Sequence, residues 1–77
     1  MGANDRWVVE YPDGGWAVEK ENRERVSDVL ATQEDAAQRA REIIRNAGGG
    51  ELIVKGRDGR IRLKDTVAPG HDSAARG

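Results

Sequence analysis

The sequence predicts an α+β domain in the order β-β-(β)-α-β-β, with one helix packed on one face of an antiparallel sheet. Two observations predict this class: two pairs of short apolar runs each reverse at a glycine-containing turn, and a run with helical periodicity separates them. A chain of 77 residues, 35% of them charged, suffices for one small domain with a thin core. We expect that domain to span residues 6–65, with a disordered N-terminus at residues 1–5 and a flexible tail at residues 66–77.

The first hairpin is predicted by RWVVEYPDGGWAVEKE, residues 6–21. Its proline fixes φ at the turn, and the following Asp-Gly-Gly accepts the positive φ values that a tight reversal needs. The two-residue period of a strand places Trp7 with Val9 on one arm and Trp16 with Val18 on the other. We expect both tryptophans to reach one core, since this fits Trp16 better than a role as an exposed platform for stacking bases.

The middle of the chain combines one open assignment with a well-marked helix. Residues 24–31 are compatible with a third strand and equally with an irregular approach to the helix. In the run that follows, Thr32 is a typical N-cap, Glu34 and Asp35 suit the positive end of the helix dipole, and Gly48 provides a stop. One apolar stripe runs down this helix: Ala36, Ala37, Ala40, Ile43, Ile44 and Ala47.

The second hairpin is predicted by ELIVKGRDGRIRLKD, residues 51–65, which reverses through Gly-Arg-Asp-Gly. On its returning strand, strict alternation places Arg60, Arg62 and Lys64 together on one face. Lys55 and Arg57 extend this group of cations around the turn. The predicted apolar core comprises Trp7, Val9, Trp16, Val18, Ala36, Ala40, Ile43, Ile44, Leu52, Val54, Ile61 and Leu63.

The order and spacing of these motifs resemble domain-of-unknown-function family 2188, a family of short bacterial proteins. The similarity covers residues 7–65 and is carried by Gly15-Trp16, Thr32, Ala36, Ala40-Arg41-Glu42 and the closing run GRDGRIR, residues 56–62. The resemblance implies a compact unit of hairpin, helix and hairpin with a prokaryotic or phage origin. It brings no catalytic residues with it.

The residue types argue against an enzyme, a metal site or a cofactor site. The chain has no cysteine, and its one histidine, His71, lies in the predicted tail beside Asp72 and near Ser73. Two adjacent ligands on a mobile segment do not fix a coordination sphere. Capping and dipole effects account for Glu34 and Asp35 without any catalytic role. We therefore expect a non-enzymatic protein without metal or cofactor.

The chain also lacks the features of a membrane protein. No apolar run approaches the roughly 20 residues that span a bilayer, and the opening MGANDR has neither the apolar core nor the basic flank of a signal peptide. We expect a cytoplasmic protein without a membrane partner.

The basic hairpin is the strongest functional candidate. Residues 1–38 carry 4 Lys and Arg against 9 Asp and Glu, whereas residues 39–77 carry 9 against 5. Cations on alternate strand residues project about 6.6 to 7 Å apart, near the spacing of successive phosphates in a nucleic-acid strand. The candidate binding residues are Lys55, Arg57, Arg60, Arg62 and Lys64. The hypothesis is therefore a binding module of unknown target, with nucleic acid as the leading specific partner.

Two alternatives compete with a nucleic-acid surface. The ladder of cations can be the solvated face of a strand, with Arg60 and Arg62 pairing with Glu10 and Glu19 of the first hairpin, as cross-strand charges commonly do. The protein can instead associate with itself or with another chain, because one helix covers one sheet face and edge strands leave backbone groups unpaired.

Overall fold

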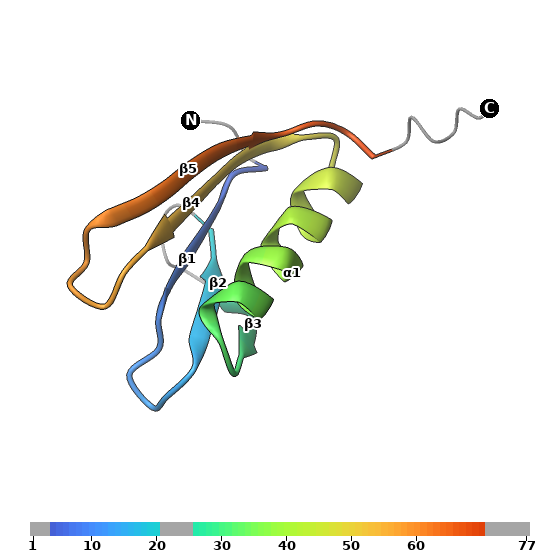
Figure 1. Cartoon of the computed structure of the whole chain (residues 1–77). Coiled ribbons are helices and arrows are strands. Elements are labelled where there is room, and N and C mark those ends of the chain that lie inside the picture. The colour runs from blue at the N-terminus through green and yellow to red at the C-terminus, as the bar shows by residue number, and fades with distance from the viewer. Residues whose placement is uncertain (1–3, 21–25, 71–77) are drawn as a thin grey trace.

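Five strands and one helix make up the part of the chain that the structure describes (Figure 1). The structure is a computed structural model, and it describes residues 4–20 and 26–70. The elements are β1 (Arg6–Glu10), β2 (Trp16–Glu19), β3 (Val26–Leu30), α1 (Gln33–Asn46), β4 (Gly50–Lys55) and β5 (Ile61–Val67). The strands form one sheet in the order β3-β2-β1-β4-β5, and α1 lies across one of its faces. The predicted α+β class is confirmed, and the open segment at residues 24–31 contains strand β3.

The sheet is mixed, so the prediction of an antiparallel sheet is wrong for one pair of strands. Within each hairpin, and between β2 and β3, neighbouring strands are antiparallel. β1 and β4 run parallel, with Arg6 beside Leu52 and Val8 beside Val54. The reason is the direction of α1, which carries the chain back to the end of the sheet where β1 begins. β4 therefore starts beside the start of β1.

The predicted signals define both ends of α1. Thr32 is the N-cap, and its Oγ1 accepts a hydrogen bond from the Asp35 backbone N–H at 3.1 Å. At the other end Gly48 has φ +109°, and the Gly49 N–H donates to the Ile44 carbonyl at 2.8 Å. Between these caps, the fully buried side chains of Ala36, Ala40 and Ile44 face the sheet.

The core lies between α1 and the sheet, and it differs from the predicted one on β1. Val8 of β1 is fully buried there, whereas Trp7 and Val9 lie on the opposite face. Trp16 pairs with Glu10 and Trp7 pairs with Glu19, so the two tryptophans do not share a core. Alternation alone could not decide this point, because three successive apolar residues of β1 offer an apolar side chain to either face.

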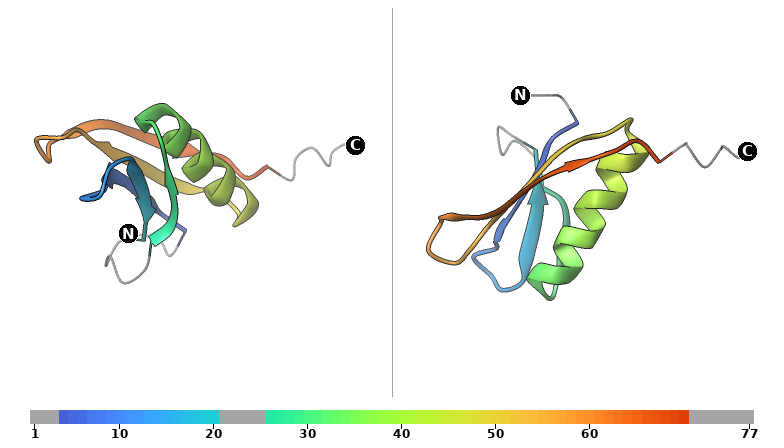
Figure 2. Two further views of the ribbon diagram at one scale, coloured as in Figure 1. Left: turned by 90° about the horizontal axis from the view of Figure 1, so that it is seen from below. Right: turned by 45° about the horizontal axis from the view of Figure 1, so that its top comes forward.

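The edge strand β5 is also less buried than predicted. Ile61 and Leu63 are 55% and 40% exposed, because the first half of β5 extends beyond the reach of α1 (Figure 2). Val67 at the other end of the strand joins the core instead. The remaining buried core residues are Val8, Trp16, Val18, Ala36, Ala40, Ile44, Leu52 and Val54, with Ile43 packed against them.

The folded unit begins earlier and ends later than predicted. Asn4 Nδ2 donates to the carbonyls of Ala47 and Gly49, both at 3.1 Å, and Asp5 Oδ1 accepts from the Glu51 N–H at 2.9 Å. Asn4 therefore ties the start of β1 to the residues that follow α1, and Asp5 ties it to β4, so these two residues belong to the folded unit.

At the C-terminal end, β5 includes Thr66 and Val67, which the sequence assigned to the tail. The residues considered for a metal or nucleophile, His71, Asp72 and Ser73, lie outside the described residues. Within the described part of the chain, the helix is too short and too polar to cross a membrane.

Candidate functional site

The β4–β5 hairpin carries all five predicted binding cations and projects from the body of the protein (Figures 1 and 2). Its turn is held by hydrogen bonds from Gly56 N–H to the Arg60 carbonyl at 2.9 Å and from Gly59 N–H to the Gly56 carbonyl at 3.0 Å. Asp58 Oδ1 accepts from the Arg60 N–H at 3.0 Å. The acid therefore stabilises the turn, and the cations occupy the arms and the tip.

A β-bulge interrupts the alternation of side chains along β5. Val54 pairs with Leu63, but the next residue of β4, Lys55, pairs with Ile61. Arg62 is therefore an extra residue on the β5 side of the pairing. A bulge of this kind turns the local side chains away from the faces that strict alternation assigns to them.

The bulge places Arg62 on the helix side of the sheet. Its side chain lies across Gly56, where a Cβ added to the glycine would come within 2.5 Å of Arg62 Nε. Lys64 lies on the other face, because it pairs with Ile53, which belongs to the face that α1 leaves uncovered. The prediction that Arg60, Arg62 and Lys64 share one face is therefore wrong.

The five cations divide between the two faces and the tip of the hairpin. Lys55 lies on the uncovered face with Lys64, and its Nζ is 5.0 Å from the centre of the Trp7 ring. Arg62 lies on the helix side, and Arg57, in the turn, lines hollows on both sides of the hairpin. Arg60 belongs to the tip, where its side chain is 87% exposed. Cations thus surround the hairpin instead of lining one side of it.

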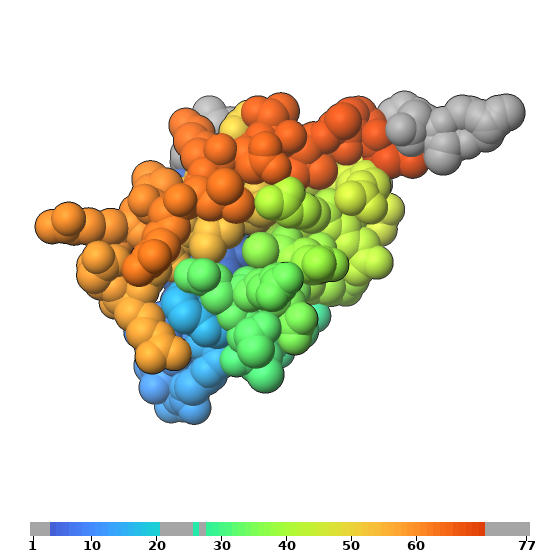
Figure 3. Space-filling model, in the orientation of Figure 1, coloured from blue at the N-terminus to red at the C-terminus, as the bar shows by residue number. Residues whose placement is uncertain are grey.

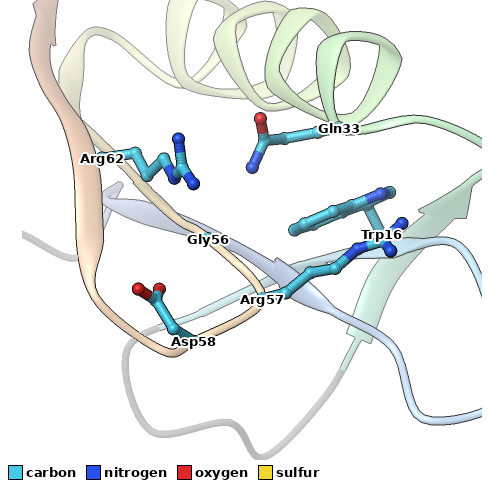
Figure 4. A pocket seen from close by; sticks show the side chains of 6 residues that line it. All are labelled: Trp16, Gln33, Gly56, Arg57, Asp58 and Arg62. Atoms are coloured by element: carbon cyan, nitrogen blue, oxygen red, sulfur yellow. The ribbon is translucent and has the colours of Figure 1, made fainter.

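A cleft of about 380 Å³ separates the hairpin from the start of α1 (Figure 4). Figure 3 shows the surface hollowed between these two parts of the molecule. Its lining residues are Trp16, Gln33, Gly56, Arg57, Asp58 and Arg62. In Figure 4 the Trp16 indole extends into the cleft between Gln33 and Arg57, and the Arg62 guanidinium points into it from the other side.

The polar groups of the cleft differ in how they are engaged. Arg57 Nε lies 3.5 Å from a Glu10 carboxylate oxygen, and its Cζ is 5.7 Å from the centre of the Trp16 ring. Gln33 Nε2 donates to the Lys55 carbonyl at 3.3 Å and keeps a second N–H. Within residues 4–20 and 26–70, no hydrogen bond or ion pair engages the Arg62 side chain. Arg62 is therefore the cation of the cleft with unused donors.

Arg57 pairs with Glu10, whereas the alternative drawn from the sequence paired Arg60 and Arg62 with acids of the first hairpin. The contact is highly exposed, with 74% of the Arg57 side chain accessible to solvent. Such pairs add little stability and exchange readily with solvent or a ligand. Arg57 therefore remains accessible to an external anion.

Arg39 and Arg41 of α1 are more firmly engaged with acids. Arg39 contacts Asp28 at 3.2 Å and Glu42 at 2.6 Å, and its hydrogen bond to Glu42 raises the pKa of Arg39 above its ordinary value. Arg41 contacts Asp65 at 2.9 Å. These side chains neutralise nearby acids, so the hairpin is the better candidate for an anion-binding surface.

Sequence reasoning missed Gln33 and gave Trp16 a role in the core alone. Trp16 is 7% exposed and does belong to the core, yet one edge of its ring also lines the cleft. Gln33 follows the N-cap directly, so a helix crossing toward β4 presents this residue to the second hairpin. The sequence does indicate where the helix starts. It does not indicate that the second hairpin lies close to that start.

The uncovered face of the sheet is more apolar than the row of cations suggested. Trp7 and Val9 lie on it beside Ala17, which is fully buried, and Ile53, which is 3% exposed. Val29 of the edge strand pairs with Ala17 and is exposed. An apolar strip therefore crosses β3, β2, β1 and β4 on this face, with Lys55 and Lys64 at one end.

Residues 6–67 match the model of a family described as uncharacterized protein conserved in bacteria, DUF2188. The chain is similar to the uncharacterized protein YdaT of Bacillus subtilis (strain 168), with 42% identity over 50 residues. That match covers 65% of this chain and 33% of YdaT, so the chain corresponds to about a third of its relative. No solved structure matches the chain.

Proposed function

The chain belongs to this bacterial family of uncharacterised proteins, DUF2188, and we propose that it is a non-enzymatic module that binds duplex nucleic acid through the β4–β5 hairpin. The observation that carries the proposal is a projecting two-stranded ribbon with cations on both of its faces and at its tip. Residues 55–64 contain five cations and one acid, although the whole chain has a net charge of −1. The positive potential is therefore local to the hairpin.

Because cations lie on both faces of the hairpin, we expect it to insert into a groove of the duplex and not to lie along one phosphate backbone. The major groove of B-DNA, about 12 Å wide, admits a two-stranded β-ribbon with phosphates on both sides. Lys55 and Lys64 would face one phosphate strand, and Arg57 and Arg62 the other. Arg60 at the tip would reach the base edges, where arginine donates to guanine O6 and N7. We further propose that this binding takes place in the cytoplasm, where bacterial DNA is accessible.

The direct test is fluorescence anisotropy with a labelled mixed-sequence DNA duplex at about 50 and 200 mM salt, where phosphate contacts respond most clearly. The double variant Arg60→Ala, Arg62→Ala should weaken binding, reduce the salt slope by about 1 through loss of the Arg62 phosphate contact, and relax the preference for guanine that Arg60 confers. The matched control, Arg39→Ala with Arg45→Ala, removes two charges from α1 and should bind almost as the parent does. An A-form RNA duplex should bind more weakly, because its deep and narrow major groove excludes the ribbon.

Two results would contradict the proposal. One is the absence of DNA binding at about 50 mM salt, where electrostatic association is strongest. The other is equal weakening by the hairpin and helix double variants, which would assign binding to total charge and not to the hairpin.

The second candidate function is self-association through the uncovered face, and the exposed Val29 with the half-buried Trp7 and Val9 on that face favour it. The same face carries acids at Glu19 and Glu51 and cations at Lys55 and Lys64, so a two-fold arrangement can set opposite charges against each other. Sedimentation velocity over a hundredfold range of concentration tests this. A dimer that Val29→Glu abolishes, while Arg60→Ala with Arg62→Ala leaves it intact, would favour the second function over the first.

A further inference from the structure

The cleft between α1 and the hairpin has the chemistry of a binding site for a small ligand. We propose that it binds a compact oxyanion, a carboxylate or a phosphate monoester, with Arg62 as the principal donor and Gln33 as the second. This site goes beyond the nucleic-acid function, since it needs neither Lys55 nor Lys64, and free ligand can occupy it without nucleic acid.

Arg62 is placed for this task by the backbone around it. The β-bulge turns its side chain to the helix side, and Gly56, which has no Cβ, leaves room for it to cross the strand. Its guanidinium points into the cleft and is engaged by no acid of the described residues (Figure 4). A planar guanidinium with free donors matches the two oxygens of a carboxylate or phosphate.

Asp58, the acid that lines the cleft, does not pair with the Arg62 guanidinium. Asp58 accepts from the Arg60 N–H at 3.0 Å, and the Arg60 side chain lies 4.0 Å from its other oxygen. The carboxylate is thereby held to the turn of the hairpin. Across the cleft, Gln33 uses one amide N–H to hold the Lys55 carbonyl and can direct the other toward a ligand.

Trp16 forms one wall of the cleft, and the charge distribution of its ring suits an anion. Arg57 lies over the face of its ring, where the electron density of an aromatic group attracts a cation. The ring edge, which carries the positive end of the aromatic quadrupole, extends into the cleft and suits an anion. Burial of the rest of the indole in the core fixes this wall in place.

The size and charge of the cleft distinguish it from the hollow on the other side of the hairpin. At about 380 Å³ it falls within the range of small-molecule sites. The other hollow, about 300 Å³, contains two acids that balance its two cations. It is lined by Val9, Glu10, Pro12, Glu19, Lys55, Gly56, Arg57 and Gly59. The cleft beside α1 therefore has the greater excess of positive charge.

The fluorescence of Trp16, which lines the cleft, reports anion binding in this experiment. In a Trp7→Phe background, Trp16 is the one remaining tryptophan, and its fluorescence is followed during titration with inorganic phosphate, methyl phosphate or acetate in the absence of nucleic acid. Ionic strength is held constant with chloride. We expect a saturable change with at least one anion, and the ratio of the phosphate and acetate affinities identifies which oxyanion the cleft takes.

Three variants assign the binding to Arg62. Arg62→Ala should weaken it about tenfold or more, and Arg62→Lys should recover only part of that loss because an ammonium cannot make the bidentate contact. Lys64→Ala removes the same charge from the same strand on the other face and should leave affinity within about twofold.

A fourth variant tests the placement of Arg62 without removing it. Gly56→Ala puts a Cβ within 2.5 Å of Arg62 Nε, so the flexible side chain must move aside. We expect anion affinity to fall as in Arg62→Ala, while far-ultraviolet circular dichroism and the unfolding midpoint remain close to those of the parent. Unchanged affinity in Gly56→Ala would contradict the proposed geometry.

Two outcomes would overturn the site itself. One is a Trp16 signal that does not saturate by about 50 mM of any anion, well beyond the millimolar range of weak binding. The other is equal weakening by Arg62→Ala and Lys64→Ala. Failure here is separable from failure of the nucleic-acid proposal. Arg62→Lys keeps the charge that DNA binding needs but weakens oxyanion binding, and a protein that binds phosphate but no DNA retains this site alone.

Discussion

The two hairpins of this protein share their turn chemistry and differ in what surrounds them. The β1–β2 hairpin lies inside the sheet, with β3 on one side and β4 on the other. The β4–β5 hairpin has its returning strand at the edge of the sheet, and its tip extends past α1 (Figure 2). The first is therefore held on both sides, whereas the second is held at its base only.

This difference accounts for where charge and apolar surface collect. A strand with neighbours on both sides and a helix above it must fill its inner face with apolar side chains, as Val8 and Val18 do. A projecting ribbon has no such requirement and can carry cations on both faces. Matched changes in the two hairpins test this contrast.

The largest expected effect compares one glycine from each turn. Gly15 and Gly59 have φ values of +85° and +82°, so an alanine is strained at both. A Cβ at Gly15 would also lie 2.6 Å from the Leu30 carbonyl oxygen of β3, whereas at Gly59 it would meet open space. We expect Gly15→Ala to lower the free energy of unfolding by about 3 kcal/mol and Gly59→Ala by about 1 kcal/mol.

Urea denaturation of the two variants beside the parent measures this difference. Equal losses would mean that β3 shifts without cost to admit the new side chain. In that case the first hairpin would not be held more tightly than the second.

A smaller effect is expected from truncating one β-branched residue in each hairpin. Val8 is fully buried between α1 and the sheet, and Val8→Ala should cost about 2 kcal/mol of unfolding free energy. Ile61 is 55% exposed at the start of β5, and Ile61→Ala should cost less than about 0.5 kcal/mol. Thermal and chemical unfolding of both variants provide the check, and a cost at Ile61 as large as that at Val8 would show that the hairpin tip packs against something in solution.

Sequence patterns predicted the elements of this fold well because their signals are local. The cap at Thr32, the glycines of both turns and the alanine-rich stripe of α1 each depend on residues close in the chain. The parallel pairing of β1 with β4 was missed, because it depends on where α1 delivers the chain. The location of Trp7 was missed for a related reason, since the pairing of strands chooses between two apolar faces of β1.

The sequence drew attention to the cations of the second hairpin but not to their arrangement. The turn signal and the alternation of the returning strand identified those cations. Their distribution depends on one bulge, which moves Arg62 from the uncovered face to the cleft beside Gln33. A pattern of strict alternation cannot predict an extra residue in a strand. A glycine at position 56 opposite a long side chain is nevertheless consistent with a β-bulge.

The smallest expected effect compares the ion pairs that connect each hairpin to its surroundings. Arg41 of α1 contacts Asp65 near the base of the second hairpin at 2.9 Å, and both side chains are partly shielded. Arg57 near the tip contacts Glu10 at 3.5 Å with far more exposure. Double-mutant cycles with alanine should give a coupling energy of about 0.5 kcal/mol for the first pair and about zero for the second.

Measuring the two coupling energies at higher salt concentration extends this last comparison. The Arg41–Asp65 coupling should persist at about 0.15 M salt, because partial burial limits screening. A larger coupling for Arg57–Glu10 than for Arg41–Asp65 would mean that the tip of the second hairpin is locked onto the first, and that the cations proposed to meet a ligand are already committed within the fold. A coupling near zero leaves Arg57 free to exchange Glu10 for a phosphate, as the proposed DNA-binding surface requires.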